Sequence, residues 1–232
     1  MKKYNVGIVG IGAVGTELVK VLRQRKFPVN EIRVLATRER DEVIAGEKLH
    51  VLPAAPENFK GLDFALFAGT EGAKGASQVY GWGAAQDGVI VIDNGDDFRM
   101  DQRVPLVIPE INPGALDAHR NFIANPNCST IIALMAAGPL HRAAGIRRMI
   151  ASTYQSVSGT GRGAIMELEA QVQAYAAHKP IKHEVYKSQI AFNLIPHIGG
   201  MKGDLPGFTS EEVKMRNETR KILGNPKIRV CA

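Results

Sequence analysis

A glycine-rich turn between an apolar segment and a helix-like segment limits the possible folds of this chain more than any other feature. Residues 4–10 form a short apolar run, and apolar residues at helical spacing, from Leu18 to Leu22, follow the turn. The turn reads Gly10-Ile11-Gly12-Ala13-Val14-Gly15. Glycines at this spacing let the backbone approach a pyrophosphate at the positively polarised start of a helix. The pattern predicts a dinucleotide-binding unit, although a tight turn that only needs small residues would look the same.

Strand-like segments alternate with helix-like or glycine-containing segments along the first half of the chain. They lie at residues 32–36, 63–67, 89–92 and 121–124, with a helix-like stretch at 72–85. Such alternation is typical of a parallel, doubly wound sheet. We therefore expect an α/β fold whose first part, residues 1–127, is a doubly wound (Rossmann) dinucleotide-binding domain.

The pattern changes after Asn125-Pro126-Asn127. A helix is expected at about 128–142, a β-rich segment at 147–155 and a helix at 163–177, which together indicate a second, α+β domain over residues 128–232. The last residues, Ile228 to Ala232, alternate like a strand that has just begun, with no turn or cap after them. We therefore expect the second domain to be incomplete at its C-terminal end.

Composition excludes several classes of protein. The formal net charge is +6, but lysine and arginine are scattered along the sequence and form no basic stripe, so nucleic-acid binding is not expected. A basic surface equally suits small phosphorylated ligands. No apolar run approaches the roughly 20 residues of a membrane span, so a cytoplasmic protein without a membrane partner is expected. The two cysteines, Cys128 and Cys231, have different contexts and predict neither a disulfide framework nor a metal site.

The segment after the second expected strand bears on the choice of cofactor. It reads Ala36-Thr37-Arg38-Glu39-Arg40, where NAD enzymes usually place an acidic residue on the ribose hydroxyls. Arg38, with Thr37 beside it, can instead bind a 2′-phosphate, which favours NADP. Glu39 keeps NAD open, and Arg38 as an ordinary solvated surface charge is a further alternative.

A cysteine lies at the start of an apolar helix. Asn125-Pro126-Asn127-Cys128-Ser129-Thr130 directly precedes Ile131-Ile132-Ala133-Leu134-Met135. A helix N-terminus favours a thiolate, which is the form that attacks a carbonyl or acyl phosphate. A small buried cysteine is the alternative, but the polar residues around Cys128 argue against an apolar site. Cys128 is thus a candidate nucleophile.

Four motifs together resemble the aspartate-semialdehyde dehydrogenase family, in the family's order and spacing and over essentially all 232 residues. The motifs are the cysteine motif, Ser152-Thr153-Tyr154-Gln155-Ser156-Val157-Ser158-Gly159-Thr160-Gly161, Phe192-Asn193-Leu194-Ile195-Pro196-His197 and Glu211-Glu212-Val213-Lys214-Met215. The resemblance implies reductive dephosphorylation of L-aspartyl 4-phosphate by NADPH to L-aspartate 4-semialdehyde, in the synthesis of lysine, threonine and methionine. It also implies a homodimer or homotetramer.

The resemblance further implies roles for individual residues. Cys128 would form the thioacyl intermediate, Gln155 and Asn127 would hold the substrate, and Ser158 with Gly159 would lie against the cofactor. Glu211 would receive the substrate ammonium, while Arg99 and Lys214 would bind the phosphoryl group; these charges suit an α-amino group and an acyl phosphate. Because Glu211 and Lys214 are three residues apart on a helix, a simple surface ion pair is the alternative.

Two departures from the family pattern affect these expectations. Gly95-Asp96-Asp97 replaces the usual two serines and an alanine, which adds negative charge near the expected phosphate site. The family's acid–base histidine and a further substrate-binding arginine would follow the segment ending at Ala232, so impaired turnover is expected of residues 1–232. The alternatives are a related acyl-phosphate reductase, such as N-acetylglutamyl-phosphate reductase, and a non-catalytic cofactor-binding homologue.

Overall fold

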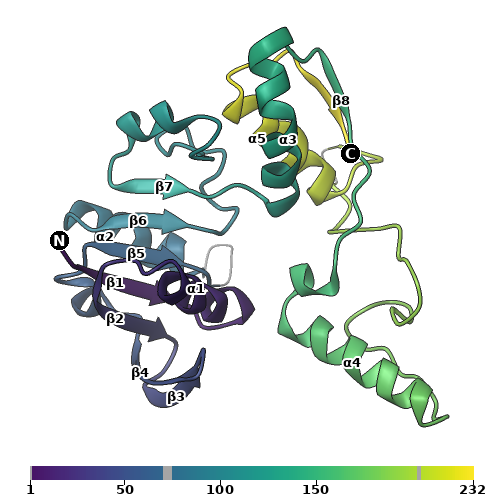
Figure 1. Cartoon of the computed structure of the whole chain (residues 1–232), viewed down its shortest axis with the longest axis horizontal. Helices are drawn as coiled ribbons and strands as arrows, with labels where there is room; N and C mark the ends of the chain where they lie inside the picture. The colour runs from purple at the N-terminus through teal and green to yellow at the C-terminus, as the bar shows by residue number, and fades with distance from the viewer. Residues whose placement is uncertain (1, 70–74, 203–204) are drawn as a thin grey trace. The chain divides into compact units, whose positions relative to one another are not determined.

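The computed structural model describes residues 2–69, 75–202 and 205–232. The chain forms two compact units, one of Met1–Ala151 and Lys214–Cys231, the other of Ser152–Val213 with Ala232 (Figure 1). The division falls within helix α5 (Ser210–Ile222). These units follow the density of contacts and do not test the expected boundary between functional domains after residue 127, which stays a prediction.

A seven-stranded sheet forms the centre of the first unit. In their order across the sheet, the strands are β3 (Arg40–Ile44), β4 (Glu47–Pro53), β2 (Val29–Ala36), β1 (Tyr4–Val9), β5 (Phe64–Phe67), β6 (Ile90–Asp93) and β7 (Phe122–Ala124) (Figure 1). All neighbours except β3 and β4 pair in parallel. Because β1 pairs with β2 on one side and β5 on the other, the topological switch lies at the end of β1, where doubly wound sheets bind dinucleotides.

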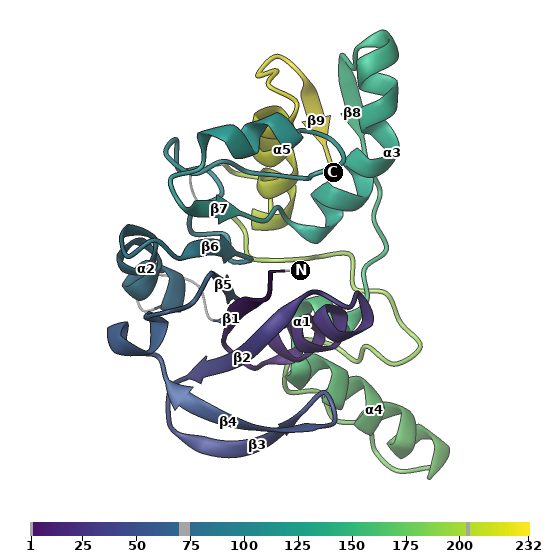
Figure 2. The same cartoon turned by 60° about the vertical axis from the view of Figure 1, so that its left-hand side comes forward.

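Helices cover both faces of the sheet because successive strand residues point to opposite sides. Ile8 packs with Val19 of α1 (Ala13–Gln24) on one face. On the other face, Val9 belongs to the cluster that includes residues of α2 (Trp82–Gln86) (Figure 2). Short helical segments complete the connections: η1 (Pro56–Phe59), η2 (Ser77–Gly81) and η3 (Pro113–Ala118). Of the helix-like stretch expected at 72–85, residues 72–74 lie outside the described part, and the helices begin at residue 77.

The edge of the sheet differs from the expected all-parallel arrangement. β3 and β4 form an antiparallel hairpin with Asp41 opposite His50, and Ala45 and Gly46 turn the chain with φ of 54° and 83°. An antiparallel strand is compatible with an edge position because the hairpin needs no crossover helix. The five strands expected from the sequence, β1, β2, β5, β6 and β7, are confirmed.

The rest of the first unit consists of two long helices and a small sheet. Helix α3 (Cys128–Ala144) and α5 pack against the main core through residues such as Leu134 and Ile222. Strand β8 (Arg148–Ile150) pairs in parallel with β9 (Arg229–Cys231). The β-rich segment expected at 147–155 was wrong beyond residue 150, because the partner strand offers only three paired residues.

The second unit contains η4 (Val157–Thr160), α4 (Arg162–Ala176) and a long segment held against α4 by side chains. Gln171 is buried, and its Oε1 accepts hydrogen bonds from the backbone N–H groups of Ile190 (3.0 Å) and Ala191 (2.9 Å). Since this segment has little regular structure, such side-chain acceptors satisfy its backbone donors. No helix among residues 2–69, 75–202 and 205–232 has both the length and the apolar character needed to cross a bilayer.

Candidate functional site

The glycine turn has the geometry that a pyrophosphate needs. A side chain at Gly15 would place its Cβ 1.9 Å from the Gly10 carbonyl oxygen, and Gly10 has φ +91°, so both positions require glycine for the turn itself. Gly12 differs, because a Cβ there would meet nothing within 4 Å. Gly12 is also the N-cap of α1, which has no side-chain cap bond and no acidic residue in its first turn. Open space before an uncapped helix N-terminus suits an anion.

The loop expected to select the cofactor lies between β2 and β3. Thr37 and Arg38 are exposed there, and Arg38 contributes its carbonyl oxygen to the Arg40 Nη1 donor at 3.0 Å. The Glu39 carboxylate lies 3.1 Å from Nε2 of His50 on β4. Glu39, the acidic residue that could otherwise bind the ribose hydroxyls of NAD, therefore already contacts His50 of the β3–β4 hairpin.

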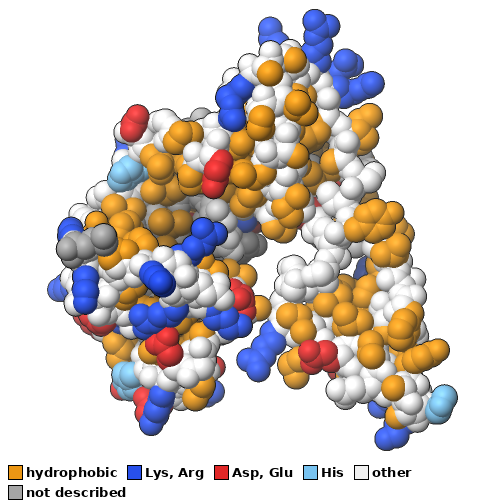
Figure 3. All heavy atoms as spheres, viewed as in Figure 1, with side chains coloured by type: hydrophobic (Ala, Val, Ile, Leu, Met, Phe, Trp, Pro, Cys, Tyr) orange, Lys and Arg blue, Asp and Glu red, His pale blue; other side chains and the backbone are white. Residues whose placement is uncertain are grey.

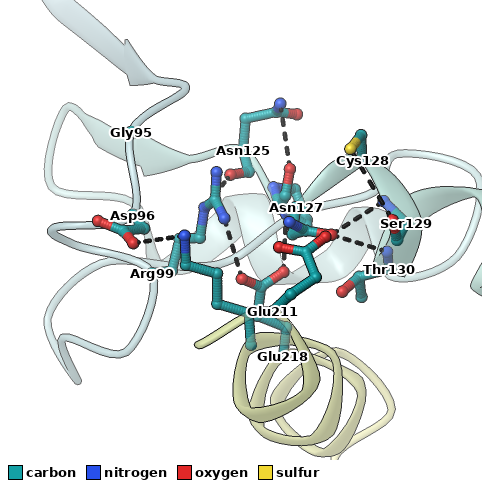
Figure 4. A network of polar contacts seen from close by, with 12 residues as sticks. Gly95, Asp96, Arg99, Asn125, Asn127, Cys128, Ser129, Thr130, Glu211 and Glu218 are labelled. Carbon is teal, nitrogen blue, oxygen red and sulfur yellow. Dashed lines mark hydrogen bonds and ion pairs between the residues drawn. The ribbon is translucent and has the colours of Figure 1, made fainter. Parts of the chain in front are cut away.

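Cys128 is the first residue of α3, and its side chain is exposed. The Asn127 side chain caps the helix by accepting hydrogen bonds from the backbone N–H groups of Ser129 (2.9 Å) and Thr130 (3.3 Å), and the Cys128 thiol lies 4.0 Å from the Ser129 hydroxyl (Figure 4). The buried-cysteine alternative is wrong, because Cys128 is accessible at the positive end of a helix dipole.

Arg99 is buried, with its guanidinium directed into the protein. Nε donates to the carbonyl oxygen of Asn125 (2.9 Å), Nη2 to that of Asn94 (2.8 Å), and Nη1 to Glu218 Oε1 (3.1 Å) (Figure 4). Three of the five N–H donors of Arg99 are thus accounted for. Phosphate binding by Arg99 stays a prediction, and any phosphate would share the guanidinium with these acceptors.

Lys214 Nζ lies 2.7 Å from the Asp96 carboxylate. The two side chains are about one-third exposed, and Asp96 is one of the residues that depart from the family pattern. The Asp96 carboxylate is therefore paired with Lys214, the second of the two cations expected to bind phosphate.

Two of the predicted substrate residues lie together in the second unit. Gln155 Nε2 donates to Glu211 Oε1 at 3.3 Å and to Thr153 Oγ1 at 3.2 Å. Ser158 and Gly159 are exposed on η4, where the Ser156 side chain accepts a hydrogen bond from the Ser158 N–H. Their roles stay predictions.

Two charged residues of α5 that the sequence did not single out belong to the network in the first unit. Glu218 is 1% exposed and pairs with Arg99, and burial raises the pKa of its carboxyl group while the Arg99 charge opposes that change. Lys221 Nζ donates to the carbonyl oxygens of Arg99 (2.8 Å), Asp101 (2.8 Å) and Val104 (2.9 Å), and burial lowers its pKa. Glu218 and Lys221 follow Lys214 at helical spacing, and this spacing was the sequence feature that could have indicated that they share a face of the helix with Lys214.

A doubly wound sheet with an open glycine turn, together with an accessible cysteine at a helix N-terminus, defines a dinucleotide-binding enzyme with a candidate nucleophile. Comparison with known proteins supports the assignment to a dinucleotide-binding enzyme. Residues 5–119 match the model of the semialdehyde dehydrogenase NAD binding domain, and residues 137–232 match that of the semialdehyde dehydrogenase dimerisation domain.

Similar proteins cover nearly the whole chain. It is 40% identical to aspartate-semialdehyde dehydrogenase of Bacillus subtilis (strain 168), over 98% of this chain and 68% of the relative. The corresponding Aquifex aeolicus enzyme is 45% identical over 99% of this chain and 68% of the relative. The crystal structure of aspartate semialdehyde dehydrogenase II from Vibrio cholerae superposes with a TM-score of 0.90 at 41% identity, covering 99% of this chain and 69% of that one. The chain belongs to the aspartate-semialdehyde dehydrogenase family of oxidoreductases, as its motifs predicted.

Proposed function

We propose that this protein catalyses NADP-dependent conversion between L-aspartyl 4-phosphate and L-aspartate 4-semialdehyde with phosphate. The observation that carries the proposal is the exposed Cys128 at the capped N-terminus of α3, in a chain of this family. A Vibrio cholerae relative has been crystallised in complex with ASA, which supports a semialdehyde substrate. An α-ammonium and a phosphoryl group on one substrate also match the mixed charges of Glu211, Arg99 and Lys214.

The proposed chemistry proceeds through a covalent intermediate on Cys128. The thiolate attacks the acyl carbon, the C–O bond to phosphate breaks, and a thioester remains on the sulfur. NADPH, when bound, would supply a hydride to the acyl carbon of this thioester. The carbon–sulfur bond then breaks, which releases the aldehyde and returns Cys128 to its thiolate form. The positive end of the α3 dipole would stabilise the thiolate both before attack and after release.

The other candidate residues would bind and orient the substrate. Gln155 and Glu211, which already share a hydrogen bond, would hold the acyl group and the α-ammonium. Arg99 and Lys214 would share the phosphoryl group, in competition with Glu218 and Asp96. Holding these groups in place makes attack by the thiolate effectively intramolecular.

We propose NADP rather than NAD because Arg38 is exposed beside the turn, whereas Glu39 lies against His50. The backbone of residues 10–15 would hold the pyrophosphate, with Thr37 and Arg38 near the 2′-phosphate and Ser158 and Gly159 against the cofactor. A relative from Candida albicans has been crystallised with NADP. The exposed Arg38, rather than that relative, supports the choice of NADP over NAD.

The function is tested by measuring phosphate-dependent NADPH formation from aspartate semialdehyde by the purified protein. Cys128→Ser should lower this rate by about 10³-fold or more, because the hydroxyl is a much poorer nucleophile at neutral pH, while NADP binding stays unchanged. Cys231→Ser is the matched control and should keep the wild-type rate. A higher specificity constant for N-acetylglutamate semialdehyde would identify the related reductase instead, and NADP binding without turnover of either aldehyde would favour the non-catalytic homologue.

We also propose a homodimer or homotetramer. Exposed apolar side chains gather on α3 and β8, where Ile132 is 73%, Leu140 67% and Ile150 70% exposed (Figure 3). Apolar side chains in such number on one surface indicate an interface, and residues 137–232 match a dimerisation domain. Light scattering should report a dimer or tetramer, and Ile132→Lys with Leu140→Lys should shift it to monomer. An oligomer unchanged by both substitutions would place the interface elsewhere.

A further inference from the structure

Helix α5 supplies a carboxylate that completes the cap of α3. In a capping box, the N-cap side chain binds a backbone N–H in the first turn, and a glutamate at the third helical position binds the N-cap N–H. In α3 the N-cap residue is Asn127, but the third helical position is Thr130. The Asn127 N–H instead donates to Glu218 Oε2 at 2.7 Å, across 91 residues of sequence (Figure 4).

The same carboxylate also holds Arg99. One oxygen of Glu218 accepts from Arg99 Nη1 at 3.1 Å, while the other accepts from the Asn127 N–H. Glu218 is 1% exposed and Arg99 6% exposed, so both charges are removed from water. Lys221, almost one turn further along α5, holds the Arg99 carbonyl oxygen at 2.8 Å. One face of α5 therefore fixes both the backbone and the guanidinium of Arg99.

The contacts of Glu218 with Arg99 and Asn127 have a consequence beyond stability. Burying an ion pair is often no better for stability than burying apolar side chains of the same volume. Here the pair has a directional consequence, because the residue that Glu218 holds is the one immediately before Cys128. A displacement of the Asn127 backbone moves the first turn of α3 and the thiol with it.

We propose that Glu218 is a positioning residue, which fixes the N-terminal turn of α3 so that Cys128 faces its substrate and which holds Arg99 in register with that turn. This inference rests on the proposed function of Cys128 as nucleophile. Loss of the carboxylate would remove the acceptor that Glu218 Oε2 offers to the Asn127 N–H and would leave the buried Arg99 charge without this carboxylate. The turn would then fray, and the positive end of the helix dipole would stabilise the thiolate less well.

The test measures the rate of Cys128 alkylation by iodoacetamide across pH, in a Cys231→Ser background so that only one thiol reacts. Glu218→Ala should slow alkylation at neutral pH about tenfold, because thiolate stabilisation by the helix N-terminus weakens. Glu218→Gln, which fills the same space and keeps one acceptor oxygen, should slow it by a smaller factor. Thr219→Val is the matched control, since Thr219 is also buried on α5 but touches neither Arg99 nor Asn127 through any hydrogen bond between described residues.

NADP binding and thermal unfolding are measured on the same variants, so that folding and positioning are separated. Glu218→Ala and Glu218→Gln should bind NADP with an unchanged dissociation constant. If both lower the melting temperature but leave the alkylation profile at its wild-type form, Glu218 is only structural and the proposal is overturned. If Cys128 in the Cys231→Ser protein reacts no faster than Cys231 in the Cys128→Ser protein, Cys128 is not an activated nucleophile, and the role proposed for Glu218 fails with it.

Discussion

Arg38 illustrates how one exposed side chain can decide between two cofactors. Its guanidinium is available at the end of β2, while the nearest acidic residue, Glu39, lies 3.1 Å from His50. A charge-assisted hydrogen bond to a 2′-phosphate contributes roughly 1.5–3 kcal/mol, whereas NAD offers no such group. Specificity would therefore follow from a single contact.

Replacement of Arg38 by alanine should consequently weaken NADP binding by at least about tenfold and leave NAD binding nearly unchanged. Calorimetric titration with both cofactors measures the two losses. Arg40→Ala is a suitable control, because Arg40 is paired with Glu42 at 2.8 Å and carries the same charge. Equal losses for NADP and NAD would exclude Arg38 from recognition of the 2′-phosphate.

Asp96 is one of the residues at which this chain departs from the family pattern near the predicted phosphate site. Its carboxylate lies 2.7 Å from Lys214, and each side chain is about one-third exposed. A partly exposed ion pair contributes no more than about 1 kcal/mol. Competition between Asp96 and phosphate for Lys214 should thus be measurable but modest.

Asp96→Ser, the residue type usual in the family, should therefore lower the KM for phosphate about fivefold with little change in kcat. Steady-state kinetics at several phosphate concentrations would show it. Asp97→Ser removes the same formal charge one residue away, and its effect should be smaller. Equal effects of both substitutions would mean that net charge matters rather than the Asp96–Lys214 pair.

The β3–β4 hairpin is an element whose stability should depend on pH. His50 pairs across the strands with Asp41, 2.8 Å from Nδ1, and its Nε2 lies 3.1 Å from Glu39. The hydrogen bond to Asp41 raises the pKa of His50, and the same bond lowers the pKa of Asp41. For a histidine whose folded-state pKa is raised, the stabilisation is fully present below the unfolded value, near 6.5, and is lost as pH rises through the folded value.

An NMR titration of the His50 ring should accordingly give a midpoint above that of a free histidine. Asp41→Asn should bring the midpoint down, since it removes the largest cause of the increase. Hydrogen exchange of the hairpin amides, corrected for the intrinsic pH dependence, should become faster as pH rises through the wild-type midpoint. A His50 midpoint that is the same in both proteins would show that the Asp41 contact has no electrostatic effect in solution.

Regular elements with strong local patterns could be predicted from the sequence, and the elements that depend on distant partners could not. The runs that became β1, β5 and β6 are mostly apolar, as is typical of strands with both faces covered. The hairpin was missed because charged residues such as Arg40 and Glu42 hide the alternation, and its turn lacks the usual Asn-Gly signal. In the candidate site, Cys128 could be predicted from the sequence because it lies at the start of an apolar helix. Glu218 could not be predicted, because the groups that it binds are 91 and 119 residues away in sequence.

At the scale of the whole molecule, the predicted cofactor residues fall in both compact units. Residues 10–15 and Arg38 belong to the first unit, and Ser158 and Gly159 belong to the second. Cofactor binding can therefore be tested separately for the predicted residues of each unit.

Hydrogen exchange with and without NADP tests the predicted cofactor residues of each unit in one experiment. At a concentration of 100 times the dissociation constant, binding stabilises the bound state by about 2.7 kcal/mol, enough to slow exchange up to about a hundredfold where opening requires release of the cofactor. Protection is expected for peptides that contain residues 10–15, Arg38 and residues 156–160. The far half of α4, residues 168–176, serves as the internal reference for the second unit and should exchange at an unchanged rate. Protection confined to residues 10–15 and Arg38 would remove Ser158 and Gly159 from the cofactor site and limit cofactor binding to the first unit.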